Sequence, residues 1–576
     1  MFLKKSKKSY KEKGYETYAL TESYREGSKV KHKHIANLGT LTPEQAQRIR
    51  LVLKAQKLED AFVGHLSDVV AKQHYRFLDV AVQDSLWRQF ELDRFFDGIP
   101  YAEAMAVNRC LDPKTKIHIK RWAEATVLPR LLGIDFPDEF EIYRTLDKIA
   151  DQEAALQKHL YQQYTRLGLT AENTVFYDIT SSYFEGTKCV LVAYGYSRDH
   201  RPDRKQVVIA LIITPEGYPL YWQVMPGNTQ DVTTVEELLC KIKERFGIEE
   251  CLLVFDRGMV SAHNLDAISG QMLTYVSALD KDEIRTLGIL EPEFPGLLAG
   301  SWQEQLFAQG FYAYDEKLFY REHFLDKHYV IAFNRQLYQE QQQSREERLQ
   351  KTKDFIASYN EELSQAQKSR NQKTTENKIA NQLRKWQMHK VISWQLEPVT
   401  MIIGAAKGNE RKVNTFRVVY TINETKLKEQ EYLDGILCFV TNDSTLTAKQ
   451  VIGHYRKKNK IEDAFREIKS YLRLRPFHLT REKRVKAHVT ICVLGYLLLN
   501  ALEEKLSRHE ESPSGPSALE LFSQCLLNRI GPKGSESYVE SITEITPAQA
   551  ELLKSLGLGY LVGKNYLDKI LEHSAM

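Results

Sequence analysis

The chain has 576 residues, and one hydrophobic core rarely extends beyond about 300 residues, so several domains are expected. Hydrophobic residues make up 43% and charged residues 27% of the sequence, which is ordinary for a soluble globular protein. The net charge is only +4, which excludes binding of a polyanion through overall charge and leaves local clusters of Lys and Arg as its source.

Cysteine usage and apolar runs exclude further classes. The seven cysteines include no C-x-x-C pair, and most stand in apolar contexts, as buried thiols do in a reducing compartment. No zinc site is expected. The longest apolar run, residues 489–499, is shorter than the roughly 20 residues that span a bilayer, and the charged N-terminus lacks the apolar core of a signal peptide. We therefore expect a soluble, cytoplasmic protein.

Residues 1–40 are expected to form a basic β-hairpin arm. Polar residues alternate there with aromatic and β-branched ones, and Glu26-Gly27 supplies the turn. The first 34 residues hold ten Lys or Arg against four Glu, which indicates either an interaction surface or a solvated tail. Thr42 and Pro43 then open a helix, and periodic apolar residues predict a helical domain over 41–170.

Residues 171–280 alternate between strands and helices. Helices are predicted at about 231–246 and 261–269. Strand-like runs occur at 174–179, 206–213, 218–224, 251–256 and 272–278. Three consecutive strands, a helix, and then another strand and helix are typical of an α/β unit of the ribonuclease-H-like kind.

An insertion is expected to split this unit. Residues 335–397 contain no Gly or Pro and are rich in Gln, Glu, Lys and Arg, which predicts a long helical hairpin. Strand-like runs lie at 328–333, 415–422 and 435–441. The boundaries that follow are 171–280 for the first part of the core, 281–440 for the insertion domain, 441–500 for the second part of the core and 501–576 for a helical C-terminal region. The predicted fold class is multidomain α/β, with a mixed sheet flanked by helices.

Two apolar runs deliver a carboxylate at or near their ends, Asp178 after 174–177 and Asp256 after 251–255. Neighbouring strand ends in an open α/β sheet converge on one crevice, so these carboxylates are expected to meet. Close carboxylates repel each other unless cations lie between them, and oxygen-only ligands favour Mg²⁺ or Mn²⁺ over zinc. The alternative is structural, because a strand-terminal Asp often caps a turn or a helix.

A third acid, Glu462, lies in the helical segment 454–469. Tyr455, Lys458 and Lys469 share its helix face by their spacing, and Arg466 joins them at i+4. An apolar stripe beside this face would dock the helix on a core: Ile461, Phe465, Ile468 and Leu472. Two strand-borne Asp and a helix-borne Glu can hold two Mg²⁺ or Mn²⁺ ions for phosphodiester chemistry. The alternative is a solvated face of ion pairs.

The spacing Tyr455-x2-Lys458-x3-Glu462-x6-Lys469 resembles the signature Y-x2-R-x3-E-x6-K of one group of DDE transposases from bacterial insertion sequences. Further segments that carry the resemblance are Asp178-Ile-Thr-Ser-Ser, the loop Gly195–Gln206, Met225-Pro-Gly-Asn-Thr229, Phe255-Asp-Arg-Gly-Met259 and Arg475-Pro-Phe-His478. The similarity covers 171–280 and 410–500 firmly and the N-terminal arm loosely.

The resemblance implies that Asp178, Asp256 and Glu462 form the acidic triad of a ribonuclease-H-like catalytic domain. It also implies an insertion domain between the second and third acids, which are 206 residues apart here.

By the same resemblance, Tyr455, Lys458 and Lys469 would contact phosphates of the transposon end. Lysine at 458 replaces the arginine of the pattern and loses the planar two-pronged grip on phosphate. Arg456 could substitute, although it projects from another helix face.

The loop 195–206 contains four cations that are candidates for DNA phosphate binding: Arg198, Arg201, Arg204 and Lys205. The alternative is a charged connection between strands, in which Asp199 and Asp203 pair with those arginines.

The sequence therefore predicts a DNA transposase that cleaves transposon ends and joins the 3′-hydroxyls to target DNA with two metal ions. Its partners would be double-stranded DNA, from terminal inverted repeats and target, and a second copy of the chain in the DNA complex. Residues 41–170 would form a helical DNA-binding domain of a nucleoid-associated bacterial protein. The alternatives are an inactive transposase relic that serves as a DNA-binding regulator, another ribonuclease-H-like nuclease, and a phosphohydrolase with Asp178 as nucleophile.

Overall fold

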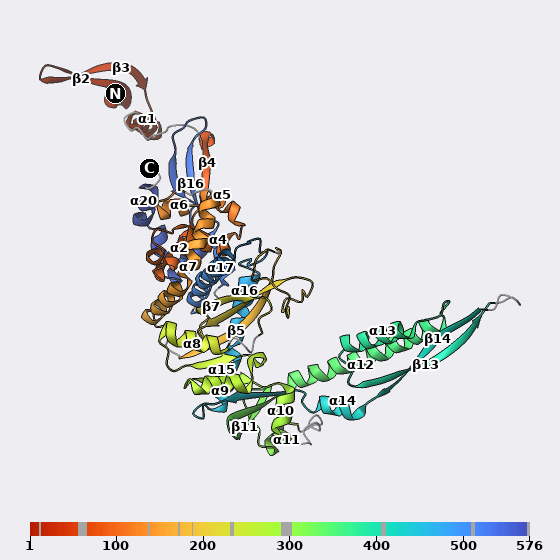
Figure 1. Cartoon of the computed structure of the whole chain (residues 1–576). Helices are drawn as coiled ribbons and strands as arrows, with labels where there is room; N and C mark the ends of the chain where they lie inside the picture. The colour runs from red at the N-terminus through yellow and green to blue at the C-terminus, as the bar shows by residue number, and fades with distance from the viewer. Residues whose placement is uncertain are drawn as a thin grey trace. The chain divides into compact units, whose positions relative to one another are not determined.

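The computed structural model describes residues 1–10, 13–55, 66–135, 139–170, 173–186, 188–230, 235–289, 302–404, 411–508 and 513–572. The chain divides into two compact units (Figure 1). The first unit comprises Met1–Thr145 and Ala501–Met576, and the second comprises Leu146–Asn500. The boundaries fall within helices α7 (Glu139–Arg166) and α17 (Glu482–Leu506).

The second unit is built on a nine-stranded mixed sheet with the strand order β10-β11-β12-β15-β9-β8-β5-β6-β7. Its strands are β5 (Thr174–Tyr183), β6 (Gln206–Ile213), β7 (Pro219–Pro226), β8 (Leu252–Phe255), β9 (Thr274–Ala278), β10 (Tyr312–Ala313), β11 (Leu318–Phe324), β12 (His328–Asn334) and β15 (Ile436–Thr441). The antiparallel strands β5, β6 and β7 form a meander, while β8 and β9 run parallel to β5. Every residue of β6 is buried, so the centre of the sheet is covered on both faces.

Helices of this unit connect and cover the strands. They are α8 (Val235–Phe246), α9 (Ala262–Gly270), α10 (Lys281–Leu287), α11 (Trp302–Ala308), α14 (Glu424–Glu431), α15 (Ala448–Lys457) and α16 (Asn459–Lys469), with a 3-10 turn at Arg257–Met259. Helices α7 and α17 are tied to β7, because Gln157 donates to the Trp222 carbonyl over 2.9 Å and the Trp222 indole donates to Thr490 Oγ1 over 2.9 Å.

The region 281–440 is not a self-contained insertion. Strand β15 pairs with β9, and β12 and β11 continue the same sheet beyond it. The sequence pattern identifies strands at 328–333 and 435–441, but it does not say which strands they pair with. The strand partners are determined by hydrogen bonds between segments over 150 residues apart.

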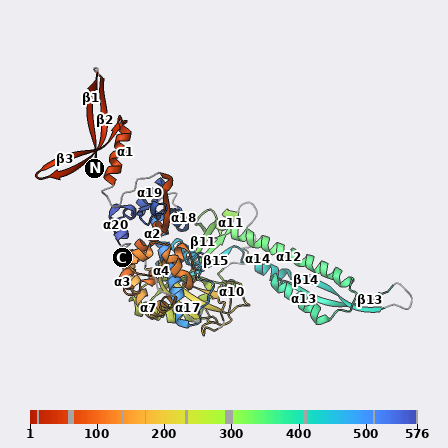
Figure 2. The same ribbon diagram turned by 90° about the horizontal axis from the view of Figure 1, so that it is seen from above.

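Between β12 and β15 lies a module with its own core, formed by α12 (Arg335–Ser364), α13 (Gln372–Lys385), β13 (Ile392–Ile403) and β14 (Arg411–Ile422) (Figures 1 and 2). Two helices and a two-stranded ribbon pack around Ile356, Leu363, Ile379, Leu383 and Val418, each at most 3% exposed. At its base, the buried Arg345 of α12 pairs with the buried Asp434 just before β15. The predicted helical hairpin is therefore part of a larger helix–ribbon module.

Helix α17 is long and apolar enough to cross a bilayer by length and composition, and it alone has this property among the residues that the structure describes. In the structure 94% of the most apolar stretch of this helix is buried inside the protein, as expected for a core helix. All seven cysteines are free, and six of them are buried, Cys240 being the exception.

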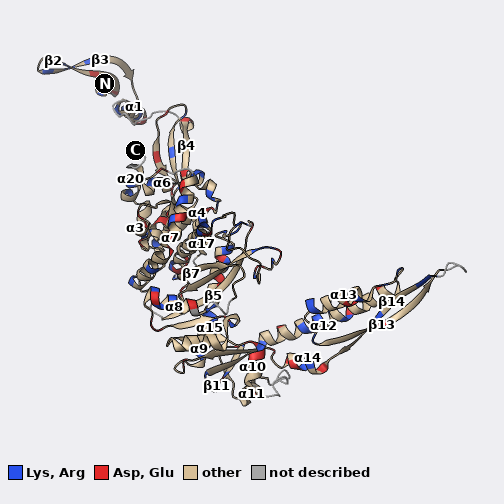
Figure 3. Cartoon of the chain, viewed as in Figure 1, with Lys and Arg blue, Asp and Glu red and all other residues tan. Residues whose placement is uncertain are grey.

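The first unit contains two three-stranded sheets and a group of helices. Its elements are β1 (Phe2–Tyr10), β2 (Lys13–Glu26), β3 (Lys29–Gly39), α1 (Pro43–Ala55), β4 (Val69–Arg76), α2 (Leu78–Gln89), α3 (Leu92–Phe95), α4 (Tyr101–Leu111), α5 (Ile119–Glu124), α6 (Leu128–Leu132), α18 (Gly515–Phe522), β16 (Leu526–Pro532), β17 (Val539–Ile542), α19 (Pro547–Ser555) and α20 (Lys564–Glu572). Lys, Arg, Asp and Glu are spread over both units (Figure 3).

The N-terminal arm has three strands rather than the two of a hairpin. Strands β2 and β3 meet at the predicted turn, where Gly27 has φ +64°, and β1 pairs along the other edge of β2. Strand β1 is rich in lysine and lacks an apolar alternation, so its sequence did not predict a strand. Leu3 and Tyr18 of this sheet pack on Ala46 of α1.

The C-terminal region 501–576 is not purely helical. Strand β16 pairs with β17 and also with β4, about 450 residues earlier in the chain. Arg130 and Arg529 both bind the Glu540 carboxylate, at 2.8 and 2.7 Å, and so fasten this sheet to α6. A strand that depends on such a distant partner carries little local signal in the sequence.

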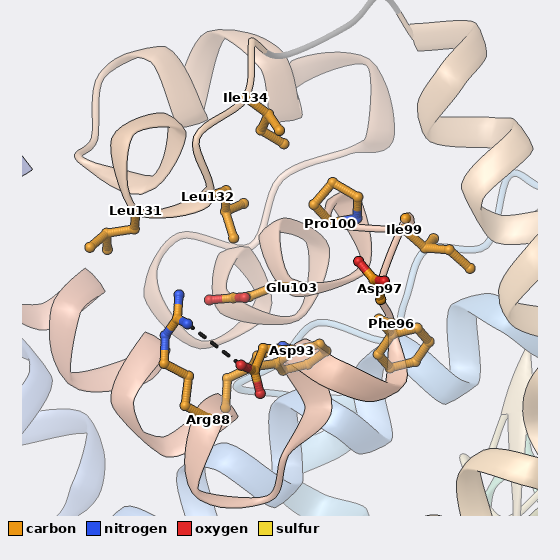
Figure 4. A pocket seen from close by; sticks show the side chains of 12 residues that line it. Arg88, Asp93, Phe96, Asp97, Ile99, Pro100, Glu103, Leu131, Leu132 and Ile134 are labelled. Carbon is orange, nitrogen blue, oxygen red and sulfur yellow. Dashed lines mark ion pairs between the residues drawn. The ribbon is translucent and has the colours of Figure 1, made fainter. Parts of the chain in front are cut away.

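A cavity of about 460 Å³ lies among α2, α3, α4 and α6, lined by Trp87, Phe96 and Leu132 (Figure 4). Glu103 projects into it and is only 2% exposed, and Arg88 lies 3.5 Å from Asp93 at its edge. Burial, and then the neighbouring Asp84 carboxylate, raise the pKa of Glu103 well above its usual value. The folded protein thus favours the neutral form of this side chain.

The raised pKa of Glu103 predicts a pH-dependent loss of stability. A carboxyl whose folded pKa lies above its unfolded value holds more protons in the folded state, so the free energy of unfolding falls as pH rises above about 4.5. Glu103→Gln, which is neutral at every pH, should be the more stable protein at pH 8, by on the order of 1 kcal/mol or more. Thermal unfolding of both proteins at pH 5 and pH 8 measures this, and a difference that does not grow with pH contradicts the assignment.

Candidate active site

Asp178 and Asp256 lie side by side because β5 and β8 are parallel neighbours. Tyr177 is the register partner of Phe255, so the residues that follow them, Asp178 and Asp256, stand at equivalent positions on adjacent strands. Adjacent strands are about 4.8 Å apart, which places the two carboxylates within reach of one another. Burial, the largest influence, raises the pKa of Asp178 to about 6, and the nearby Asp256 charge acts in the same direction.

The Asp256 carboxylate accepts one hydrogen bond from its neighbour in sequence and one from a distant helix. Its Oδ1 accepts a hydrogen bond from the Arg257 backbone N–H over 2.9 Å, and thereby caps the short turn Arg257–Met259. The same oxygen accepts a hydrogen bond from the Tyr455 hydroxyl over 3.2 Å. Asp256 therefore caps a turn, as its structural alternative predicts, and it also accepts an orienting hydrogen bond from the helix pair α15–α16.

Glu462 lies in the first turn of α16, and its side chain is 58% exposed. The segment is not one continuous helix: α15 ends at Lys457, α16 begins at Asn459, and Lys458 stands at the junction. The predicted shared face therefore spans a helix break, and Tyr455 belongs to α15. Helix α16 docks through the predicted apolar stripe, whose members are all at most 6% exposed: Ile461, Phe465, Ile468 and Leu472.

The Lys458 ammonium lies among the three acids. Its Nζ is 2.9 Å from Glu462 Oε1 and 3.9 Å from Asp256 Oδ1, and its side chain is only 4% exposed. Burial alone would lower the pKa of Lys458, but the carboxylates of Asp256, Glu462 and Asp178 raise it above its usual value. One lysine thus compensates carboxylates from β5, β8 and α16.

These three carboxylates offer the oxygen donors that Mg²⁺ and Mn²⁺ prefer. The three acids are grouped around an ammonium, and among the described residues no three His, Cys, Asp or Glu side chains stand close enough together to hold a metal ion. The donor chemistry therefore fits a hard divalent cation, while the arrangement in the structure is that of an ion-paired cluster.

Lys469 is engaged at the opposite end of α16. Its Nζ donates to Thr180 Oγ1 over 2.6 Å and to Asp199 Oδ1 over 2.9 Å, and its side chain is 12% exposed. Arg475 Nη1 lies 3.1 Å from the other Asp199 oxygen. Lys458 and Lys469, both predicted to contact DNA phosphates, are thus held by carboxylates of the chain itself.

The loop 195–206 is fastened next to β5. Gln206 is 1% exposed and donates to the carbonyls of Tyr196 and Gly227. A Cβ at Gly195 would lie 2.2 Å from the Gly227 carbonyl oxygen, so this close approach requires glycine. The Arg198 backbone N–H donates to Ser181 Oγ over 2.9 Å. These contacts place the loop beside the strand that carries Asp178.

The loop cations differ in their partners. Asp203 pairs with Arg201 at 2.8 Å and with Arg204 at 3.6 Å, as the structural alternative predicted. Asp199 instead pairs with Lys469 and Arg475. Lys205 lies over the Tyr194 ring at 5.9 Å, and Arg198 over the Tyr196 ring at 5.8 Å.

On the helices, Arg456 pairs with Asp315 at 2.9 Å, and the exposed Arg466 pairs with Asp463. Local spacing could not reveal the ion pairs of Asp199 or the bond from Tyr455 to Asp256, because each joins segments about 200 residues or more apart.

Comparison with known families identifies the family to which this chain belongs. A family model of the transposase DDE domain matches residues 172–309 and 310–498, which is more than half of the chain. This chain belongs to the DDE transposase family. A second model, the N-terminal domain of IS1634 family transposases, matches residues 3–62. The protein is therefore a DNA transposase, an enzyme of DNA cleavage and strand transfer.

Two solved structures are similar to this transposase at low identity. A piggyBac transposase synaptic complex with hairpin DNA matches with a TM-score of 0.33 and 7% identity, over 82% of this chain and 75% of that one. A Mos1 transposase paired-end complex with the left transposon end matches with a TM-score of 0.14 and 11% identity, over 41% of this chain and 68% of that one. No curated protein matches the sequence.

The position of Lys458 predicts a cation-dependent stability for this transposase. Lys458→Met leaves the carboxylates of Asp178, Asp256 and Glu462 without their shared ammonium, and two of these are half-exposed, so the loss should be about 1–2 kcal/mol. Thermal unfolding in EDTA should show this loss, and added Mn²⁺ should reverse much of it. Lys458→Arg is the control that keeps a cation. Equal stability of Lys458→Met and the wild type in EDTA would refute the shared-cation arrangement.

Proposed function

We propose that Asp178, Asp256 and Glu462 are the catalytic acids of this transposase and hold two Mg²⁺ or Mn²⁺ ions. The observation that carries the proposal is the grouping of three carboxylates: the Lys458 ammonium lies 2.9 Å from Glu462 and 3.9 Å from Asp256, and the strand register sets Asp178 beside Asp256. Two divalent ions held there would activate the attacking oxygen and stabilise the leaving oxygen during phosphodiester cleavage and strand transfer.

The sheet topology supports a ribonuclease-H-like assignment for the catalytic core. The order β7-β6-β5-β8-β9 has an antiparallel meander followed by two strands parallel to β5. Asp178 is the fifth residue of the ten-residue strand β5, rather than its end as the sequence predicted, and Asp256 follows the last residue of β8. The pairing of Tyr177 with Phe255 brings Asp178, inside its strand, to the level of Asp256 just after the neighbouring strand.

The side chains around the acids have distinct roles in this proposal. Tyr455 orients the Asp256 carboxylate through its hydroxyl. Lys458 holds the carboxylates together against their mutual repulsion. An attacking water or 3′-hydroxyl must lose a proton as its oxygen bonds to phosphorus, and the leaving oxygen departs on the opposite side.

The partners that we infer are the terminal inverted repeats, target DNA and a second copy of the chain, because two element ends must be processed together. Candidate phosphate contacts are Tyr455, Arg456, Lys458, Arg466, Lys469, Arg198, Arg201, Arg204 and Lys205. Of these, Arg456 and Arg466 are exposed, while Lys458 and Lys469 are largely covered. The lysines of the N-terminal sheet add a second basic surface, on which Lys4, Lys29 and Lys33 are exposed.

Glu462→Gln tests the catalytic assignment. Losing one metal-binding carboxylate should remove several kcal/mol of transition-state stabilisation, and cleavage of a labelled transposon end in Mg²⁺ should fall by at least about 1,000-fold. End binding in a gel-shift assay should remain within about threefold of the wild type. Glu467→Gln, one turn further along the same helix, is the matched control. Cleavage by Glu462→Gln at the wild-type rate would overturn the triad, and a wild type inactive on every end would favour the relic alternative.

Salt dependence tests the N-terminal basic surface. Each Lys–phosphate contact releases counterions and contributes about 0.9 to the slope of log K against log salt. Replacing Lys4, Lys7, Lys29 and Lys33 by Gln should therefore reduce the slope for duplex binding by up to about 4, without loss of the folded sheet. Fluorescence anisotropy between 50 and 300 mM salt measures the slope. An unchanged slope would exclude this surface from DNA binding.

A further inference from the structure

Asp199 is a buried carboxylate that joins three separate parts of the catalytic unit. Its side chain is 8% exposed. Lys469 at the end of α16 lies 2.9 Å away, Arg475 lies 3.1 Å away, and the Tyr183 backbone N–H of β5 donates to it over 3.2 Å. Two cations and one backbone amide thus bind the same carboxylate, and the proposed reaction does not require a substrate to contact it.

The contacts of Asp199 run beside the proposed acids. Thr180 lies two residues after Asp178 and therefore on the same face of β5, and Lys469 lies seven residues after Glu462 and therefore on the same face of α16. The Lys469 ammonium bridges Thr180 and Asp199, at 2.6 and 2.9 Å. The Lys469 bridge therefore connects β5, which carries Asp178, to α16, which carries Glu462, through residues close to both acids in sequence.

A direct contact of Lys469 with a DNA phosphate is the competing explanation. The Lys469 side chain is 12% exposed, and its charge already has a buried carboxylate partner. A phosphate would have to displace Asp199 from Lys469, and so break an ion pair between two side chains that are 8% and 12% exposed, while Asp199 kept only Arg475 and the Tyr183 N–H of the partners named above. The geometry therefore favours a structural bridge over a phosphate contact.

We propose that Asp199 is a positioning residue which, through Lys469, sets the spacing between β5 and α16 and hence between Asp178 and Glu462. The proposal rests on the proposed roles of those two acids. It also assigns Lys469, a signature residue of the family resemblance, to the support of the acids rather than to the grip on DNA.

Asp199→Asn in the full chain is the first test, with Asp203→Asn, an exposed carboxylate in the same loop, as the matched control. A displacement of about 1 Å at a catalytic centre can cost about 100-fold in rate, so the single-turnover cleavage rate in Mg²⁺ should fall by about that factor. The apparent Kd for Mn²⁺, measured on the DNA-free protein from the EPR signal of free Mn²⁺, should rise by about 10-fold. Affinity for the transposon end should change less than threefold.

A double-mutant cycle with Lys469→Met separates the two explanations. If Asp199 acts through Lys469, Asp199→Asn/Lys469→Met should cleave no more slowly than the slower single variant. If Lys469 grips a phosphate independently, the two effects multiply and Lys469→Met weakens end binding on its own, which overturns the proposal. Asp199→Glu, which keeps the charge, should recover part of the Mn²⁺ affinity if the variant proteins melt at similar temperatures.

These outcomes are distinguishable from failure of the catalytic assignment. If the wild type cleaves in Mg²⁺ and Asp199→Asn matches it in rate and Mn²⁺ affinity, the positioning role is wrong while the triad stands. If Glu462→Gln cleaves normally, the triad itself is wrong. A rate loss in Asp199→Asn that is fully explained by a smaller folded fraction, measured by circular dichroism, also overturns the positioning role.

Discussion

The repulsion between the carboxylates that β5, β8 and α16 bring together is the constraint on which the catalytic unit depends. Two like charges a few ångströms apart in a partly buried site destabilise the folded chain, and the pKa of Asp178, raised to about 6, shows the cost of burial there. The chain meets this constraint with the Lys458 ammonium, which lies within 4 Å of both Asp256 and Glu462. The carboxylate cluster therefore includes a compensating cation from the chain itself.

The scaffold around this cluster explains how residues so far apart in sequence are held in register. The parallel pairing of β5 with β8 aligns the first two acids through backbone hydrogen bonds, without any need for contact between their side chains. The third acid comes from a helix that docks through buried apolar residues, so its position depends on packing. The module between β12 and β15 has its own core, which lets 206 residues separate the second and third acids without disturbing the sheet.

Local sequence patterns were sufficient for the parts of the fold that local chemistry determines. The apolar runs of 206–213 and 272–278 predict strands, which the structure has at 206–213 and 274–278, and the apolar stripe of α16 predicts its buried face. The patterns could not predict that β15 and β12 extend the catalytic sheet, or that β16 pairs with β4, because those strands depend on distant partners. The lysine-rich β1 was missed because it lacks an apolar alternation, although its partner β2 follows it directly in the chain.

The candidate site shows the same division between local and distant information. The acids could be proposed from apolar runs and helix spacing, although β5 continues beyond Asp178 to Tyr183. The helix break at Lys458 and the bond from Tyr455 to Asp256 arise from docking.

The two signature lysines of α16 differ from the exposed cations in a way that bears on DNA recognition. Lys458 and Lys469 are 4% and 12% exposed and are each paired with carboxylates of the chain, so their charges are largely compensated within the fold. Affinity for a polyanion depends on cations that can release counterions, and those lie on the surface. Arg456 and Arg466 are exposed, and each is in a surface ion pair, Arg456 with Asp315 and Arg466 with Asp463, which a phosphate can replace at little cost; Arg456 also lies over the Tyr314 ring at 4.8 Å. The exposed arginines are therefore better candidates than the two covered lysines for binding DNA phosphates.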